Sequence, residues 1–428
     1  MKLRGAAWQV PVVLALALGA WAFLSVAAVR HGFFDLNVYY GAVRYWANGH
    51  EIYDYLRPHA EYGFTYPPFA VLAMSPMAVV GWHTAIAISV TLTVLATGAV
   101  LYWSVDPLAR REGWTRWFAI AVAACLAAAY EPMRETVNFG QVNMVLVVLV
   151  LADLLLLVGP GRRFAGVGIG LATAIKLTPA VFVLYLVVTR RWRAAAVAVG
   201  TATAATLLAA VIAPDESRVF WTDALLNTDR IGSKAFVSNQ SLQGVVARIG
   251  LVAPWSTLLW VVLVLAALAV WQWRARAAVA AGDELTGFTL TAIAACLVSP
   301  FTWVHHLVWV LPAFPLLLDT ALARSTRRPR RALLLTFAVG GYVLLCSRFV
   351  WPYDAPRNFT AQVFSDAYAL FCVALLVVLP VRSGGGRQGE AEGGDLAVGD
   401  GVAAGGSVGG EPVPLVEPAR PLVPVERP

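Results

Sequence analysis

Long apolar runs separated by short polar segments dominate this chain. A helix that crosses a bilayer needs about 17–25 mostly apolar residues, fewer where it is buried among other helices. The pattern therefore predicts an all-α polytopic membrane protein with about twelve transmembrane helices. The expected runs cover roughly 8–29, 67–81, 82–103, 117–130, 141–158, 164–188, 194–213, 251–272, 286–301, 303–320, 331–350 and 363–382.

Composition and charge agree with this pattern. Hydrophobic residues make up 59% and charged residues 13% of the 428 residues, which excludes a soluble globular enzyme, a disordered chain and a coiled coil. The net charge is +7, but the basic residues gather in short loops, as cytoplasmic loops require. No nucleic-acid partner is therefore expected. The four cysteines form no CxxC pair and predict neither a disulfide framework nor a zinc site.

The two ends of the chain lie outside this pattern. The first apolar run is longer than the 7–15 residues of a signal-peptide core, so we interpret it as an uncleaved first span that follows a cytoplasmic N-terminus, residues 1–7. Residues 8–382 then form the membrane domain. From 383 to 428 the sequence is rich in Gly, Glu, Pro and Val without periodicity, which predicts a disordered cytoplasmic tail.

Basic loops indicate the orientation of most spans. The arginines of 190–193, 274–276 and 324–331 face the cytoplasm if 214–250, 301–304 and 348–362 face outward. Counting spans from the N-terminus places four other arginines on the outer face, which breaks the rule. Either 67–81 or 164–188 is then a re-entrant hairpin, and the sequence leaves the choice open. The four arginines are Arg110, Arg111, Arg162 and Arg163.

The first polar loop, 30–66, lies on the outer face if the first span leaves the cytoplasm. Helical spacing of apolar residues from Leu36 to Trp46 predicts an amphipathic helix at the interface. Asp35 precedes this helix among aromatic residues, where a partly desolvated carboxylate is available as a general base, although an ordinary solvated acid fits equally well. Tyr66 stands in the segment Phe64–Phe69, whose two prolines also fit a plain helix start.

Other polar groups at the ends of runs are candidates for substrate contact. Amides suit sugar hydroxyls but also cap or join helices. A lysine within an apolar run, such as Lys176, faces a water-filled cavity or an oppositely charged partner. Asp153 is the candidate partner. Cationic groups suit a phosphate ester, and paired histidines suit a phosphate or a hydroxyl. These candidates are Asn138, Gln141, Lys176, Arg230, Lys234, Asn239, Gln240, His305 and His306.

Taken together and in this order, the motifs resemble glycosyltransferase family 87. The motifs are Asp35 after the first span, then Phe64-Thr65-Tyr66-Pro67-Pro68, Asn138-Phe139-Gly140-Gln141, Lys176-Leu177-Thr178-Pro179, Asn239-Gln240-Ser241 and Trp303-Val304-His305-His306. This family comprises actinobacterial polyprenol-phosphate-mannose-dependent α-(1→2)-mannosyltransferases with the GT-C membrane fold. The resemblance covers about residues 8–380.

The resemblance implies a GT-C-like bundle with an extracytoplasmic first loop and the active site on the outer face of the plasma membrane. The implied donor is polyprenyl-phosphate-mannose, and the implied acceptor is a lipid-linked mannoside or glycan. Asp35 matches the family's general base, and His305 and His306 match its histidine pair. The same assignment makes the run 141–158 rise outward, which places Asn138 and Gln141 on the cytoplasmic side. No cofactor or metal is expected.

Two other functions remain open at this stage. A GT-C enzyme that uses another lipid-linked sugar, such as arabinose or glucose, fits the same motifs. A lipid or solute transporter is the second alternative, because an intramembrane pair of Lys176 and Asp153 would resemble a coupling site. The acceptor is not encoded in any motif: phosphatidylinositol mannosides, lipomannan and other mannans all fit.

Overall fold

The computed structural model describes residues 7–27, 31–58, 62–227 and 231–382. The chain divides into two compact units, Met1–Gly384 and Gly385–Pro428. The fold below is that of the first unit. The predicted tail, 383–428, and nearly all of the predicted N-terminal segment lie outside the described residues.

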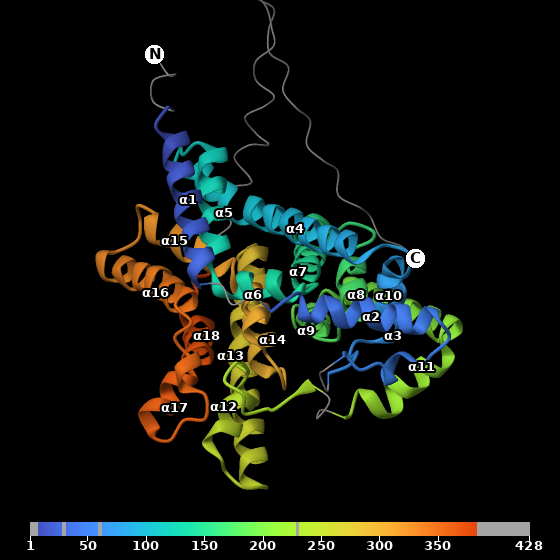
Figure 1. The fold of residues 1–428 in the computed structure, drawn as a ribbon. Coiled ribbons are helices and arrows are strands. Elements are labelled where there is room, and N and C mark those ends of the chain that lie inside the picture. Colours follow the sequence, from blue (N-terminus) through green and yellow to red (C-terminus); the bar gives the residue numbers. More distant parts are fainter. Residues whose placement is uncertain (1–6, 28–30, 59–61, 228–230, 383–428) are drawn as a thin grey trace, which may run out of the picture. The chain divides into compact units, whose positions relative to one another are not determined.

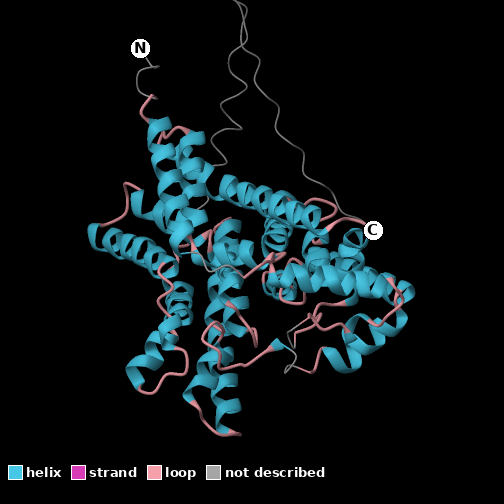
Figure 2. Ribbon diagram, viewed as in Figure 1, coloured by secondary structure: helices cyan, strands magenta, loops and turns pink. Residues whose placement is uncertain are grey.

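The described residues form helices joined by loops, with no β-strand drawn among them (Figures 1 and 2). The helices of the first half are α1 (Gln9–Ala27), α2 (Phe34–Ala47), α3 (Pro68–Met74), α4 (Trp82–Arg111), α5 (Arg116–Ala129), α6 (Glu131–Phe139), α7 (Asn143–Ala152) with its π-helical extension η3 (Asp153–Val158), α8 (Val167–Ile175) and α9 (Ala180–Val188). Those of the second half are α10 (Trp192–Ile212), α11 (Pro214–Val219), α12 (Leu242–Ile249), α13 (Trp255–Ala280), α14 (Glu284–Val298), the 3-10 segment η6 (Val304–Val310), α15 (Ala313–Leu322), α16 (Arg328–Cys346), α17 (Phe359–Ser365) and α18 (Ala367–Val378).

The predicted all-helical membrane class is confirmed, but the expected count of about twelve spans is too high. Six helical segments of the described chain are long and apolar enough to cross a membrane, or eight if two bent pairs each count as one span. The six are α1, α4, α10, α13, α16 and the segment Val304–Leu322. Helix α14 has only 15 residues and is buried almost throughout. Hydropathy alone cannot separate such a core helix from a lipid-facing span.

Helices α8 and α9 form a hairpin, so the run 164–188 does not cross as one continuous helix. Gly166 and Gly170 of α8 lie against successive turns of α10, near Ala194 and Ala198. Helix α9 then returns, and Arg191 just beyond it pairs with Glu284 at the start of α14. Because α8 and α9 have nine residues each, each covers about 14 Å, roughly half of the hydrocarbon core. Lys176 therefore stands at the tip of a re-entrant hairpin.

The arginine-rich connections at 110–116, 162–163 and 190–193 gather with Arg382 at one end of the first unit, which we call the arginine end. Arg111 pairs with Asp319 at 2.6 Å, and Arg382 pairs with both Asp283 and Asp319. Arg193 donates to the carbonyl oxygen of Arg163 at 3.2 Å. The four arginines noted above therefore lie at the same end as the other arginine-rich connections, and the separation that counting spans predicts is wrong. The reason is that 67–81 contains only the short α3 and a 3-10 turn and that 164–188 returns to its starting side.

The first helix links this topology to the loop that carries Asp35. Gln9, at the beginning of α1, donates to Thr115 Oγ1 at 2.8 Å, next to Arg116 at the arginine end. Helix α1 then runs to the opposite end, where α2 begins with Phe34 and Asp35. The predicted amphipathic helix is confirmed as α2, which buries Leu36, Tyr39 and Val43. We call this opposite end the Asp35 end.

Candidate active site

Asp35 lies in the first turn of α2, where the chain packs against the end of α6. Phe33, in the left-handed conformation with φ 55°, precedes it and donates its backbone N–H to the carbonyl oxygen of Asn138 at 2.9 Å. The side chain of Asp35 is partly buried and accepts a hydrogen bond from Gln141 Nε2 at 2.6 Å. Positive charge at a helix N-terminus favours a carboxylate here.

Gly140 makes this approach of α6 to α2 sterically feasible. Its φ is +69°, and a Cβ at this position would lie 2.5 Å from Leu36 Cβ. Any other residue would push α2 away and would also strain the backbone. The chain then turns by 115° from α6 into α7, which brings Gln141 under Asp35.

Two buried tyrosines hold the other end of the Gln141 amide. The hydroxyls of Tyr39 and Tyr66 lie 2.8 Å apart, and each is 3.2 Å from Gln141 Oε1. Burial, followed by the nearby Tyr66 and Asp35, raises the pKa of Tyr39 well above its usual value, so Tyr39 stays a neutral donor. Because the tyrosines donate to Oε1, the amide nitrogen of Gln141 must point to Asp35.

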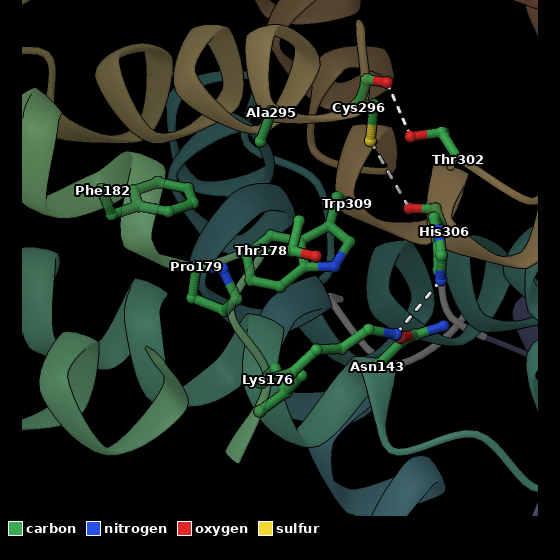
Figure 3. Close-up of a pocket in the computed structure, with 11 residues that line it drawn as sticks. Asn143, Lys176, Thr178, Pro179, Phe182, Ala295, Cys296, Thr302, His306 and Trp309 are labelled. Carbon is green, nitrogen blue, oxygen red and sulfur yellow. Dashed lines mark hydrogen bonds between the residues drawn. The ribbon is translucent and has the colours of Figure 1, made fainter. Parts of the chain in front are cut away.

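Lys176 reaches the same cluster from the tip of the hairpin. Its Nζ lies 3.1 Å from the Tyr66 hydroxyl, 3.2 Å from Asn143 Oδ1 and 3.1 Å from His306 Nε2. All three partners are uncharged groups. Figure 3 shows Lys176, Asn143 and His306 converging at one side of a small cavity.

The predicted pairing of Lys176 with Asp153 is wrong. The Asp153 carboxylate accepts hydrogen bonds from the backbone N–H groups of Gly166 and Ile169, each at 2.9 Å. It therefore fixes the start of the hairpin, a helix length away from Lys176. The ammonium group of Lys176 has no carboxylate partner within 4 Å among the residues that the structure describes.

The two histidines belong to η6 and differ in their surroundings. His306 Nδ1 accepts the backbone N–H of Trp303 at 3.2 Å, which favours a ring proton on Nε2, facing Lys176. His305 is buried, with its ring 5.4 Å from Phe139 between centroids, and its Nε2 has no hydrogen-bond partner in the structure. Lys176 Nζ and His306 Nε2 thus lie 3.1 Å apart, in a contact whose donor depends on the His306 tautomer.

Burial raises the pKa of Asp35 from an ordinary 3.8 to about 6. The hydrogen bond from Gln141 opposes this effect, as do the positive charges of Lys176, His31 and Arg57. A carboxyl group with this pKa is ionised at neutral pH and is more basic than an exposed aspartate, which suits a general base.

Comparison with known sequences identifies the family of this chain. Residues 64–300 match the sequence profile of glycosyltransferase family 87. The chain belongs to this family. The matched segment begins after Asp35 and ends before His305, so it does not itself cover these residues.

Curated relatives extend the similarity over most of the chain. One, a polyprenol-phosphate-mannose-dependent alpha-(1-2)-phosphatidylinositol mannoside mannosyltransferase of Mycolicibacterium smegmatis, is 33% identical and covers 88% of this chain and 90% of the relative. Another, the corresponding pentamannoside mannosyltransferase of Mycobacterium tuberculosis, is 32% identical over 72% of each chain. Among solved structures, ArnT from Cupriavidus metallidurans bound to undecaprenyl phosphate has a TM-score of 0.36 at 19% identity, covering 87% of this chain and 76% of that one.

Gln141 lies at the Asp35 end and donates to Asp35 at 2.6 Å, so the expectation that the Asn138–Gln141 motif lies on the side opposite to Asp35 is wrong. Helix α6 lies at the Asp35 end, and after the 115° bend the run 141–158 heads toward the arginine end. Asn138 is half-buried and joins the site through its backbone carbonyl.

The remaining candidates are not brought into this cluster by any contact. Arg230 lies outside the described residues. Lys234 is half-buried, and its backbone carbonyl accepts from Asn239 Nδ2 at 3.0 Å. Asn239 and Gln240 are fully buried and bond to backbone groups, among them Pro300 O and Ser365 O, so they fix loops at the Asp35 end.

Replacing Gln240 with leucine should therefore destabilise the protein rather than alter substrate binding. The Gln240 amide donates to Val237 O at 2.6 Å and to Ser365 O at 2.8 Å, and accepts from Ala369 N at 3.0 Å. Each buried group left without a partner costs about 1–3 kcal/mol. We expect a lower melting temperature in detergent and an unchanged KM in the protein that remains folded. A raised KM at unchanged thermal stability would contradict this interpretation.

Sequence reasoning did not select four residues of this region. Tyr39 donates to Gln141, and Asn143 accepts from Lys176. His31 and Glu135, which lie 2.8 Å apart, were not selected. A signal existed: a histidine four residues before the candidate base, and Glu131 and Glu135 one helical turn apart in an otherwise apolar region.

Proposed function

We propose that this protein transfers mannose from polyprenyl-phosphate-mannose to a phosphatidylinositol mannoside on the outer face of the membrane. The product carries an α-(1→2) linkage, and Asp35 is the general base of an inverting displacement. The observation that carries the proposal is the arrangement of Asp35 within one hydrogen-bonded chain that also includes Gln141, Tyr66 and Lys176. These hydrogen bonds join the carboxylate of Asp35 to the ammonium group of Lys176, whose close partners among the described residues are uncharged.

The donor, the acceptor class and the linkage follow from the names of the relatives. Those relatives match this chain over most of their own lengths, which supports the same reaction here. The outer location is supported by the charge distribution. Loops rich in Lys and Arg stay in the cytoplasm, and Asp35 lies at the end of the first unit opposite to the arginine end.

In the proposed reaction, Asp35 removes the proton from an acceptor hydroxyl as that oxygen attacks the anomeric carbon of the β-mannosyl phosphate. The bond between this carbon and the phosphate oxygen breaks, and its electron pair leaves with polyprenyl phosphate. Attack from the face opposite to the leaving group converts the β-linkage of the donor into an α-linkage. No covalent sugar–enzyme intermediate forms.

Lys176 and His306 are the groups best placed to receive the leaving phosphate. Lys176 Nζ and His306 Nε2 lie 3.1 Å apart, and a phosphate oxygen between them accepts from both when His306 Nε2 carries a proton. Stabilising charge that develops on a leaving group is among the largest contributions to catalysis. The cavity beside them has a volume of about 10 Å³, room for one water, so donor entry requires these side chains to part.

The transporter alternative loses the feature that supported it. It depended on an intramembrane pair of Lys176 and Asp153, and Asp153 is occupied by backbone N–H groups of the hairpin. The test is a transfer assay with the purified protein, a phosphatidylinositol mannoside and a radiolabelled lipid donor. We expect label in the acceptor with the mannosyl donor. Label only with an arabinosyl or glucosyl donor, or no product at all, would contradict the proposal.

The activity should depend on pH through Asp35. Because its pKa is raised to about 6, the carboxylate is largely ionised above this value and protonated below it. We expect kcat/KM to be nearly constant between pH 7 and 8 and to fall about tenfold for each unit well below pH 6. Initial rates measured from pH 5 to 8 test this, and an acidic limb centred near pH 4 would show that Asp35 is not buried as described.

A further inference from the structure

His31 lies four residues before Asp35 in the chain and contacts helix α6. Its Nε2 lies 2.8 Å from Glu135 Oε2, and its ring stacks on Phe139 at 4.1 Å between centroids. The approach to Glu135 lacks the angle of a directional hydrogen bond. The contact is therefore mainly one between charges.

Two groups that can carry positive charge, Arg348 and His31, contact Glu135 among the described residues. Glu131 and Glu135 are almost completely buried, with exposed fractions of 0% and 2%. A single guanidinium, that of Arg348, serves both, at 3.5 Å and 2.7 Å. The nearby Arg134 directs its guanidinium to the carbonyl oxygen of Cys346. Buried carboxylates without a compensating cation are costly, and the 2.8 Å contact with His31 places a second group that can carry positive charge beside Glu135.

Neutral donors complete the surroundings of Glu131. Trp351 Nε1 lies 2.5 Å and the Tyr368 hydroxyl 2.6 Å from its carboxylate. These bonds satisfy oxygen lone pairs but add no positive charge. Among the described residues, the charge of the second carboxylate, that of Glu135, can therefore be balanced by Arg348 and His31.

The backbone from His31 to Asp35 leaves little freedom between the two side chains. Gly32 and Phe33 both have positive φ, 61° and 55°, and a left-handed phenylalanine is uncommon enough to need support from its surroundings. That support includes the bond from Phe33 N to Asn138 O and the stack of His31 on Phe139. The position of Asp35 thus depends on the contacts of His31 with Glu135 and Phe139.

We propose that His31, protonated and held by Glu135, is a positioning residue that seats the Asp35 segment on α6 and favours the charged form of the base. The inference rests on the proposed role of Asp35. The other cations near Asp35 are Lys176 from the hairpin and Arg57 from the first loop. The facing neutral groups are Gln141 and Tyr39, and His305 lies beyond Phe139.

The test compares pH profiles of kcat/KM for H31Q, E135Q and the double variant. Loss of a positive charge makes ionisation of a neighbouring carboxyl harder, so its pKa rises and activity is lost at low pH first. A shift of about one unit lowers kcat/KM about fivefold at pH 6 and less than twofold at pH 8. Glutamine at 31 keeps a donor for Glu135, so the segment should stay folded.

The double variant separates the proposed role from a purely structural one. If Glu135 acts by keeping His31 charged, H31Q and E135Q shift the profile equally and the double variant shifts it no further. H83Q, an exposed histidine at the start of α4, is the matched control and should leave the profile unchanged. A profile identical to wild type, or losses that are independent of pH and add up in the double variant, would overturn the inference.

The activity of D35N distinguishes failure of the proposed role of His31 from failure of the proposed function. If D35N remains active, Asp35 is not the base and the proposed mechanism falls. If D35N is inactive while H31Q and E135Q keep the wild-type profile, the mechanism stands and the role of His31 alone is refuted. E135Q keeps an oxygen for Arg348, so it provides the test even where H31Q does not fold.

Discussion

Asparagine in place of Asp35 should lower the rate of mannosyl transfer by about 10²–10⁴-fold, the usual contribution of a general base. The amide has nearly the shape of the carboxylate but cannot take a proton from the acceptor. The measurement is the initial rate of label transfer by the purified variant. Its matched control is D54N, because Asp54 is an exposed aspartate of the same loop, and this variant should keep wild-type activity.

The D35N variant should not be less stable than the wild-type protein. A carboxyl whose pKa is raised by folding stabilises the protein only while it is protonated, and this contribution is lost as pH rises through about 6. At pH 8 the native protein therefore holds a charged group at a net cost that D35N removes. We expect a melting temperature at pH 8 equal to or above that of wild type. Loss of activity together with a much lower melting temperature would mean that Asp35 is structural.

Replacing Lys176 with glutamine should lower kcat by about 10²–10³-fold, as removal of one charge-stabilising donor does in other enzymes. Among the described residues, the close partners of the ammonium group are Tyr66, Asn143 and His306, so its charge is available to the departing phosphate. The effect should appear in kcat more than in the KM of the acceptor. Single-turnover rates with a labelled donor measure it.

The control for Lys176 is an exposed cation at the other end of the molecule. R162Q removes a charge from the loop before the hairpin and should leave the rate within about twofold of wild type. Arginine at 176 should recover part of the activity, since it restores the charge with a different shape. An unchanged kcat in K176Q would contradict the proposed role of Lys176.

The position of Asp35 at the start of α2 could be predicted from the sequence because its signal is local. A carboxylate that follows the first span and precedes an amphipathic helix must lie near the membrane surface, whatever the rest of the chain does. The apolar face of α2 has the same kind of signal, and the structure buries it as expected.

The surroundings of Asp35 could not be predicted in the same way, because they depend on angles between helices. Gln141 meets Asp35 only because the chain turns by 115° between α6 and α7, and hydropathy does not encode a turn. The run 164–188 is long enough for one span, so only its packing against α10 identifies it as a hairpin. Asn239 and Gln240 have the residue types of a sugar site but satisfy backbone groups instead.

The linkage formed from a donor of defined configuration tests the central claim most directly. The purified protein is given polyprenyl β-mannosyl phosphate and a phosphatidylinositol mannoside, and the new bond is analysed by nuclear magnetic resonance and by α-(1→2)-specific mannosidase digestion. A single displacement driven by Asp35 predicts an α-(1→2) bond that the mannosidase removes. A β-linked product, or transfer that proceeds through a trapped mannosyl–enzyme intermediate, would contradict it.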